Sequence, residues 1–144
     1  MRRFKFNLEK ILQLRKFKEE EAKLALGQAV SFLNKIENDI KETAVKRHNA
    51  ASQRFAETGQ IMTWEHYITR LDKEADQLTE KAAQAEIVVE EKRNLYLEAQ
   101  KDLKAMEKLK EKRQKEYRKE LLNHEITEID NLTAARFSSM SSEQ

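Results

Sequence analysis

The sequence has no cysteine and no proline, and glycine occurs only twice, at Gly27 and Gly59. Without cysteine the chain forms no disulfide and offers no thiolate nucleophile. With so few helix-breaking residues, little interrupts a long helix, and two widely separated glycines cannot make a phosphate-holding loop. Uninterrupted apolar runs, of which Ile87–Val89 is among the longest, are too short to span a bilayer, and no apolar signal-peptide core follows the basic N-terminus. We therefore expect a soluble, intracellular protein.

Charged residues make up 38% of the 144 residues, yet the formal net charge is only +2. Two stretches repeat apolar residues at alternating steps of four and three, which is the period of helices that supercoil around each other. The first follows Leu8, Leu12, Arg15, Glu19, Ala22, Leu26, Ala29, Leu33, Ile36, Ile40, Thr43, Arg47 and Ala51. The second follows Trp64, Ile68, Leu71, Ala75, Leu78, Ala82, Ala85, Val89, Lys92, Tyr96, Ala99, Leu103 and Met106, and continues more weakly through Lys110, Arg113, Tyr117 and Glu120 to His124.

The repeats predict helices over about residues 7–56 and 64–135, a hairpin loop over about 57–63 and a frayed C-terminal tail over 136–144. Asn7 and Thr63 are suitable N-caps, and Gly59 suits the left-handed position after a helix. Because a short loop between long helices makes them antiparallel, the predicted fold is all-α. It is a long antiparallel two-helix coiled-coil hairpin with unequal arms, in a single domain of residues 1–144.

The register of this hairpin follows from pairing positions whose numbers sum to about 120. Such pairing sets large side chains against small ones, for example Leu33 against Ala85, so that the layers interdigitate. A homodimer that uses the same two seams stays an alternative at this point.

The second predicted helix continues well beyond the partner that the first can supply. Its extension carries a further apolar stripe of Tyr117, Leu121, Leu122, Ile126, Ile129 and Leu132. An apolar stripe on an unpaired helix favours contact with another chain.

No constellation of residues suggests chemistry. None of the three histidines, His48, His66 and His124, has a second histidine or a cysteine at metal-ligand spacing. The carboxylate clusters Glu19-Glu20-Glu21 and Glu90-Glu91 are followed by Lys or Arg at three or four residues, as in surface ion pairs. A two-helix hairpin also lacks the cavity that a catalytic acid needs. We expect no enzyme activity, no catalytic residue, no metal, no cofactor and no small-molecule ligand.

Two basic segments fall at the open end of the predicted hairpin. Residues 1–18 hold seven basic residues and one acidic, and residues 101–119 hold nine basic and four acidic. They suit a solvated face, a nucleic acid, a membrane surface or an acidic lumen in a protein. No aromatic residues interleave with them as base stacking requires, and the apolar extension favours a protein.

An aromatic and apolar cluster adjoins the predicted loop. It comprises Phe55, Ile61, Met62, Trp64 and Tyr67. Two interpretations stay open: a plug that seals the hairpin, or a docking site anchored by Tyr67, which lies off the seam.

Several motifs follow one another along the chain. They are Phe6-x-Leu8-x-x-Ile11-Leu12-x-Leu14-Arg15, then Glu20-Glu21-Ala22, Gly59…Trp64…Tyr67…Leu71, Ala105-Met106-Glu107-Lys108-Leu109-Lys110-Glu111-Lys112-Arg113 and Glu125…Glu128-Ile129-Asp130. In this order they resemble the FliJ family of bacterial flagellar export components. The resemblance spans nearly the whole chain.

The resemblance implies an antiparallel coiled coil similar to the shaft of rotary ATP synthases. It implies insertion of the terminal end into the ring of the hexameric flagellar export ATPase, contact with the cytoplasmic domain of the membrane export gate, and escort of export chaperones. The expected location is the cytoplasm, peripherally at the inner face of the membrane at the flagellar base. The expected ATPase-ring contacts are Leu8, Leu12, Arg15, Met106, Leu109, Arg113 and Ile126. The expected gate contacts are Tyr67 and Leu71, whereas Ala44 and His48 stand where family members often carry tyrosines.

Two other functions remain as alternatives from the residues alone. One is a homo-oligomeric coiled-coil scaffold whose extensions pair with each other. The other, less favoured, is a basic helical hairpin that binds nucleic acid, although no nucleic-acid partner is our expectation.

Overall fold

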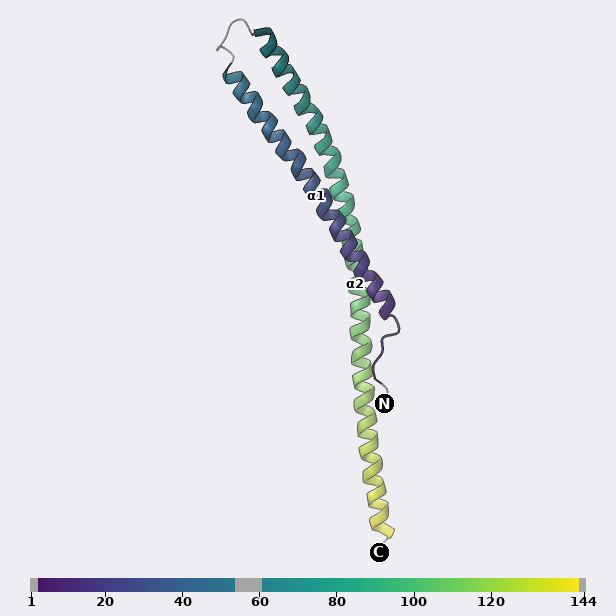
Figure 1. The fold of residues 1–144 in the computed structure, drawn as a ribbon. Coiled ribbons are helices and arrows are strands. Elements are labelled where there is room, and N and C mark those ends of the chain that lie inside the picture. The colour runs from purple at the N-terminus through teal and green to yellow at the C-terminus, as the bar shows by residue number, and fades with distance from the viewer. Residues whose placement is uncertain (1–2, 54–60, 143–144) are drawn as a thin grey trace. The chain divides into compact units, whose positions relative to one another are not determined.

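The structure is a computed structural model that describes residues 3–53 and 61–142. Within these ranges the chain forms two helices, α1 (Glu9–Ser52) and α2 (Ile61–Ser142), and no strand (Figure 1). The two helices pack against each other as a hairpin, which confirms the predicted all-α fold. The arms are unequal, with 44 residues in α1 and 82 in α2.

The N-terminal end of α1 differs from the prediction by two residues. The backbone N–H of Glu9 donates to the carbonyl of Phe6 at 3.1 Å, which places Asn7 within a turn. The first helical bond runs from the N–H of Leu12 to the carbonyl of Leu8 at 2.9 Å. Leu8 therefore holds the cap position, and the assignment of Asn7 as the N-cap was wrong.

The ends near the loop and at the C-terminus also differ. α1 ends at Ser52 rather than at about residue 56, and α2 already begins at Ile61, so Thr63 is a helical residue and not a cap. Gly59 and most of the predicted loop lie outside the described residues. The tail expected to fray from residue 136 is helical to Ser142, because neither glycine nor proline follows Gly59 to stop the helix.

Contacts divide the chain into two units, which we describe separately. Unit 1 combines Met1–Phe17 with Lys101–Gln144, and unit 2 is Lys18–Gln100. The prediction of one domain over residues 1–144 stays a prediction.

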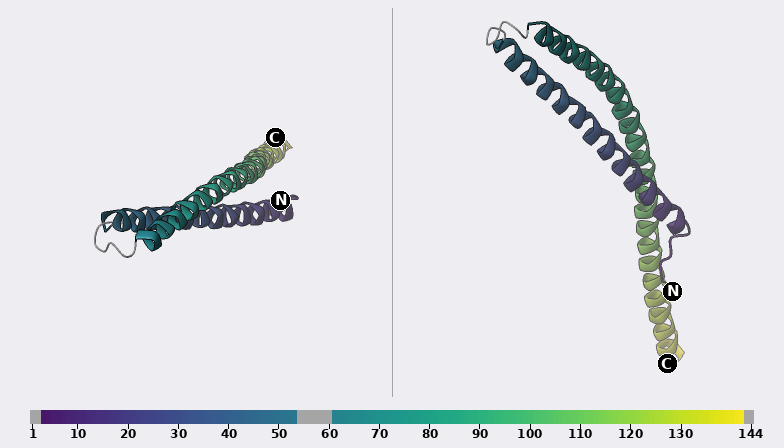
Figure 2. Two further views of the ribbon diagram at one scale, coloured as in Figure 1. Left: turned by 90° about the horizontal axis from the view of Figure 1, so that it is seen from above. Right: turned by 45° about the horizontal axis from the view of Figure 1, so that its top comes forward.

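The core of unit 2 lies on the predicted seams. Ile36, Ala82 and Ala85 are buried, and three half-buried side chains pack against them: Leu33, Ile40 and Leu78. Aliphatic side chains of α1 thus meet alanines of α2, and Figure 2 shows the two helices side by side in this unit from two directions. Small residues on one face let two helices approach closely.

Two contacts in unit 2 fix the pairing of the helices. Arg47 Nε donates to Asp72 Oδ1 at 2.5 Å, and Trp64 Nε1 donates to the carbonyl of Ala50 at 2.6 Å. Ala50 is buried whereas Ala51, which was assigned to the seam, is exposed. The assignment failed because it took two successive steps of four, while the three-residue step after Arg47 leads to Ala50.

In unit 1, the described residues before Glu9 are not helical. Phe6 is 8% exposed and lies under the Arg113 guanidinium, whose carbon is 5.9 Å from the ring centre. The rings of Phe4 and Tyr117 are 5.4 Å apart at 49°. The segment Phe4–Leu8, which we call the N-terminal strap, therefore covers the seam of α2 beyond the start of α1.

Candidate functional site

All seven residues predicted to contact an ATPase ring belong to unit 1. They are not equally accessible. Leu12 is only 2% exposed, and Leu8, Met106 and Leu109 are half-buried, so these four mainly hold the hairpin together. Arg113 and Ile126 are exposed and available to a partner. The role of the seven residues stays a prediction.

Ion pairs join α1 to α2 inside unit 1. Arg15 Nη1 lies 2.9 Å from Asp102 Oδ2, and Lys110 Nζ lies 2.9 Å from Glu9 Oε2. Gln13 Nε2 also donates to Glu9 Oε1 at 3.0 Å. The hydrogen bonds from Lys110 and then Gln13 lower the pKa of the Glu9 carboxyl, because both favour its charged form.

Beyond the strap, α2 carries apolar side chains on an uncovered surface. Leu121 is half-buried, and every residue from Leu122 to Ser141 is exposed. We call the following set the uncovered stripe: Leu122, Ile126, Ile129, Leu132, Phe137 and Met140. The sequence predicted its first four members. Phe137 and Met140 were missed because the tail was expected to fray, although their spacing already continues the helical period.

The charges beside the uncovered stripe are mostly negative. Glu120, Glu125, Glu128 and Asp130 outnumber Arg136 between residues 120 and 141. His124 Nδ1 lies 3.7 Å from Glu128 Oε1 on the same helix. The uncovered stripe thus combines apolar anchors with an acidic border, next to the strongly basic residues 101–119.

The two residues predicted to contact the gate lie in unit 2 and differ in exposure. Leu71 is 2% exposed and fills the seam, whereas Tyr67 is half-buried with the Arg70 guanidinium 5.2 Å from its ring centre. Only Tyr67 offers surface to a partner. Of the cluster around the loop, Met62 is exposed and Trp64 half-buried, while Phe55 and the side chain of Ile61 lie outside the described side chains. The two interpretations of this cluster stay open.

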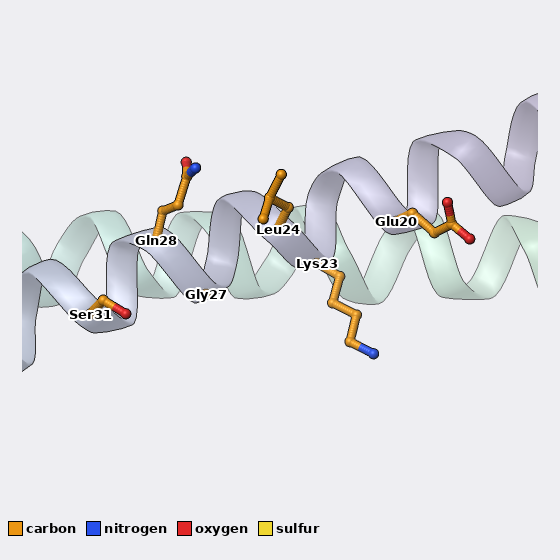
Figure 3. Close-up of a pocket in the computed structure, with 6 residues that line it drawn as sticks. All are labelled: Glu20, Lys23, Leu24, Gly27, Gln28 and Ser31. Carbon is orange, nitrogen blue, oxygen red and sulfur yellow. The ribbon is translucent and has the colours of Figure 1, made fainter.

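A shallow depression of unit 2 follows the outer face of α1, and sequence reasoning did not single it out. It is lined by Glu20, Lys23, Leu24, Gly27, Gln28 and Ser31, all from one helix (Figure 3). A Cβ on Gly27 would meet nothing within 4 Å, so no close packing explains the glycine. The depression is open and has no buried polar group to orient a ligand.

The described residues hold no cluster of metal-ligating side chains and no helix able to cross a membrane. In residues 3–53 and 61–142 no three His, Asp or Glu side chains are grouped to hold an ion. His48, His66 and His124 are all exposed. Neither described helix has a stretch long and apolar enough to cross a bilayer.

The geometry defines a helical hairpin, in which seams hold the two arms together and one arm continues with an uncovered apolar stripe. The family model described as Flagellar FliJ protein matches residues 4–142. The chain belongs to the FliJ family, whose members are components of flagellar protein export. No curated protein and no solved structure gives a match.

Proposed function

We propose that this chain is a non-enzymatic adaptor and shaft of flagellar type III export. Its unit 1 inserts into the ring of the export ATPase, and its unit 2 contacts the cytoplasmic domain of the membrane export gate and export chaperones. The chain acts in the cytoplasm, at the inner face of the membrane beneath the flagellum. Membership of the FliJ family supports the pathway.

The uncovered stripe is the observation that carries the ATPase proposal. Six large apolar side chains on residues 122–140 face solvent, with exposed fractions from 49% to 75%. Burying such surface against a partner is favourable by about 25 cal/mol per Å². A ring lumen lined with apolar and charged side chains is a partner that would cover several sides of one helix at once.

Two basic residues of unit 1 are engaged in ion pairs between α1 and α2, which favours a protein partner over a nucleic acid. Arg15 is paired with the carboxylate of Asp102, and Lys110 is paired with that of Glu9. Cations used inside the hairpin are less available to phosphates. The acidic border of the uncovered stripe would also repel a polyanion.

A shaft of this kind needs no active site. It stimulates an ATPase if it binds one conformational state of the ring more tightly than another, since only differential affinity shifts an equilibrium. The exposed Arg113 supplies a charged contact and the uncovered stripe supplies apolar contacts, and these lie at different positions along α2.

The test compares two matched variants of exposed apolar residues. Ile126→Ser with Ile129→Ser changes the uncovered stripe, and Val45→Ser changes an equally exposed site on α1. If each isoleucine loses about 1–1.5 kcal/mol of burial, the double variant weakens binding to a purified hexameric export ATPase roughly 30–150-fold. Val45→Ser should leave the affinity within about twofold, because Val45 lies in unit 2.

A truncation gives the contradicting outcome. Ending the chain after Lys119 removes the uncovered stripe but keeps Tyr117 and its contact with the strap. Unchanged ATPase binding and stimulation by this truncated chain would refute the proposal. Titration calorimetry and steady-state ATP turnover measure the two properties.

A further inference from the structure

The pairing in unit 2 determines which side chains flank the seam. In the core of unit 2 the seam layers pair Leu33 with Ala85 and Ile36 with Ala82, so the residue numbers of each pair sum to 118. The residue numbers of the hydrogen-bonded pair Arg47 and Asp72 sum to 119, which agrees with this register. Seam positions alternate between two kinds, one reached by a step of four residues and the other by a step of three. In an antiparallel pair, the residues that come just before the first kind on the two helices lie on the same flank of the seam. Phe32, which precedes Leu33, therefore lies beside Val88, which precedes Val89.

Positions on this flank recur every seven residues along unit 2, and we call the surface that they form the apolar flank. Its rows pair Ala25 with Leu95, Phe32 with Val88, Asp39 with Lys81, and Lys46 with Glu74. Phe32, Val88 and Leu95 are 60%, 42% and 52% exposed, so large apolar side chains from both helices adjoin each other in solvent.

The opposite flank of the seam has a different character. Its rows pair Lys23 with Arg93, Val30 with Glu86 and Glu37 with Thr79. It carries one large apolar side chain, Val30, which is half-buried. Of the two flanks of the seam, only the apolar flank therefore carries exposed large apolar side chains from both helices, and adjoining apolar side chains of this kind mark a protein-binding surface.

The charged side chains of the apolar flank are not held in ion pairs within the described chain. Asp39, Lys81, Lys46 and Glu74 form none of the ion pairs that join described residues. Each row sets a charge of one sign on α1 and the opposite sign on α2, and the sign alternates between the two rows. A surface with this pattern is complementary to itself.

We propose that the apolar flank binds a second copy of this chain, face to face, to form a four-helix arrangement over unit 2. A two-fold axis along the hairpin sets α1 of each copy over α2 of the other at the same level. Phe32 then meets Val88 of the second copy, and Asp39 meets Lys81 of the second copy. Lys46 meets Glu74 of the second copy in the same way. Because of the two-fold symmetry, each of these contacts between the two copies occurs twice. The inference goes beyond the ATPase proposal and does not depend on it.

The decisive experiment uses two charge-reversal variants that are mixed. Asp39→Lys sets like charges against Lys81 of the second copy, and Lys81→Asp sets like charges against Asp39 of the second copy. Each variant alone should raise the dimer dissociation constant at least tenfold in sedimentation equilibrium over about 5–500 µM at low salt. An equimolar mixture should recover the affinity of the original chain, because Asp39→Lys in one copy then faces Lys81→Asp in the other.

The mixing step separates dimerisation from damage to the hairpin. Any effect of like charges within one chain persists in the mixture, so only pairing between chains restores association. Phe32→Ser should also abolish the dimer, and Val45→Ser, equally exposed but outside the apolar flank, should not. A mass of 17.0 kDa at every concentration, or a mixture no better than its components, would overturn the proposal.

Single cysteines test the arrangement, since the natural sequence has none. Under mild oxidation, a chain with Phe32→Cys should crosslink to a chain with Val88→Cys at least fivefold faster than either crosslinks to itself. Faster self-crosslinking of either chain would overturn the two-fold axis along the hairpin. ATPase binding by Asp39→Lys should be unchanged, so the failure of one proposal is distinguishable from the failure of the other.

Discussion

Replacing Ile36 by alanine should remove a large part of the stability of unit 2. Ile36 is 5% exposed and packs with Ala82 and Ala85, flanked by Leu33 and Leu78. The change deletes three buried carbon atoms, and at about 0.8 kcal/mol for each the loss of burial is about 2.4 kcal/mol. The alanines opposite cannot reach into the vacated space, which adds a cavity cost and brings the expected loss to about 3 kcal/mol.

That loss is large against a total stability of about 5–15 kcal/mol for a folded domain. The assay is urea unfolding followed by circular dichroism at 222 nm, with Val45→Ala as the matched control. Because Val45 is exposed on the same helix, its truncation should change the unfolding free energy by less than about 0.5 kcal/mol. A loss below about 1 kcal/mol for Ile36→Ala, at an unchanged denaturant slope, would mean that the seam does not hold unit 2 together.

Three further predictions concern the ends of the hairpin. Because Lys110 and Gln13 lower the pKa of the Glu9 carboxyl, the ionised carboxylate stabilises the fold at pH values above the ordinary carboxyl pKa. That stability is lost as the pH falls through the lowered pKa of Glu9, so the loss of folded protein between about pH 5 and 3 should be less steep for Glu9→Gln. Phe6→Ala should free the strap and speed amide hydrogen exchange around Lys110 in mass spectrometry, and unchanged exchange there would show that the strap contributes nothing. Trp64→Phe removes the donor to the Ala50 carbonyl and should cost about 1 kcal/mol in thermal unfolding, whereas an unchanged melting temperature would count against that bond.

The candidate site was predictable in part. The apolar period beyond Tyr117 indicated an uncovered stripe, because spacing alone shows which side chains share a helix face. Its last members, Phe137 and Met140, were missed because the last residues of the chain were expected to fray. Sequence also did not separate Leu12 and Leu71, which are buried in the seams, from exposed partner-binding residues. Both kinds of residue are apolar and periodic, and only packing distinguishes them.

The sequence by itself determined the two helices, their antiparallel pairing and most of the seam. A four-three apolar period and the near absence of helix breakers act locally, so they can be read without a fold. Only the tertiary structure decided that the Trp64 indole donates to the Ala50 carbonyl, and that the strap of Phe4 and Phe6 lies on α2. Those contacts join residues far apart in the chain and depend on how side chains fill space, which no local pattern records.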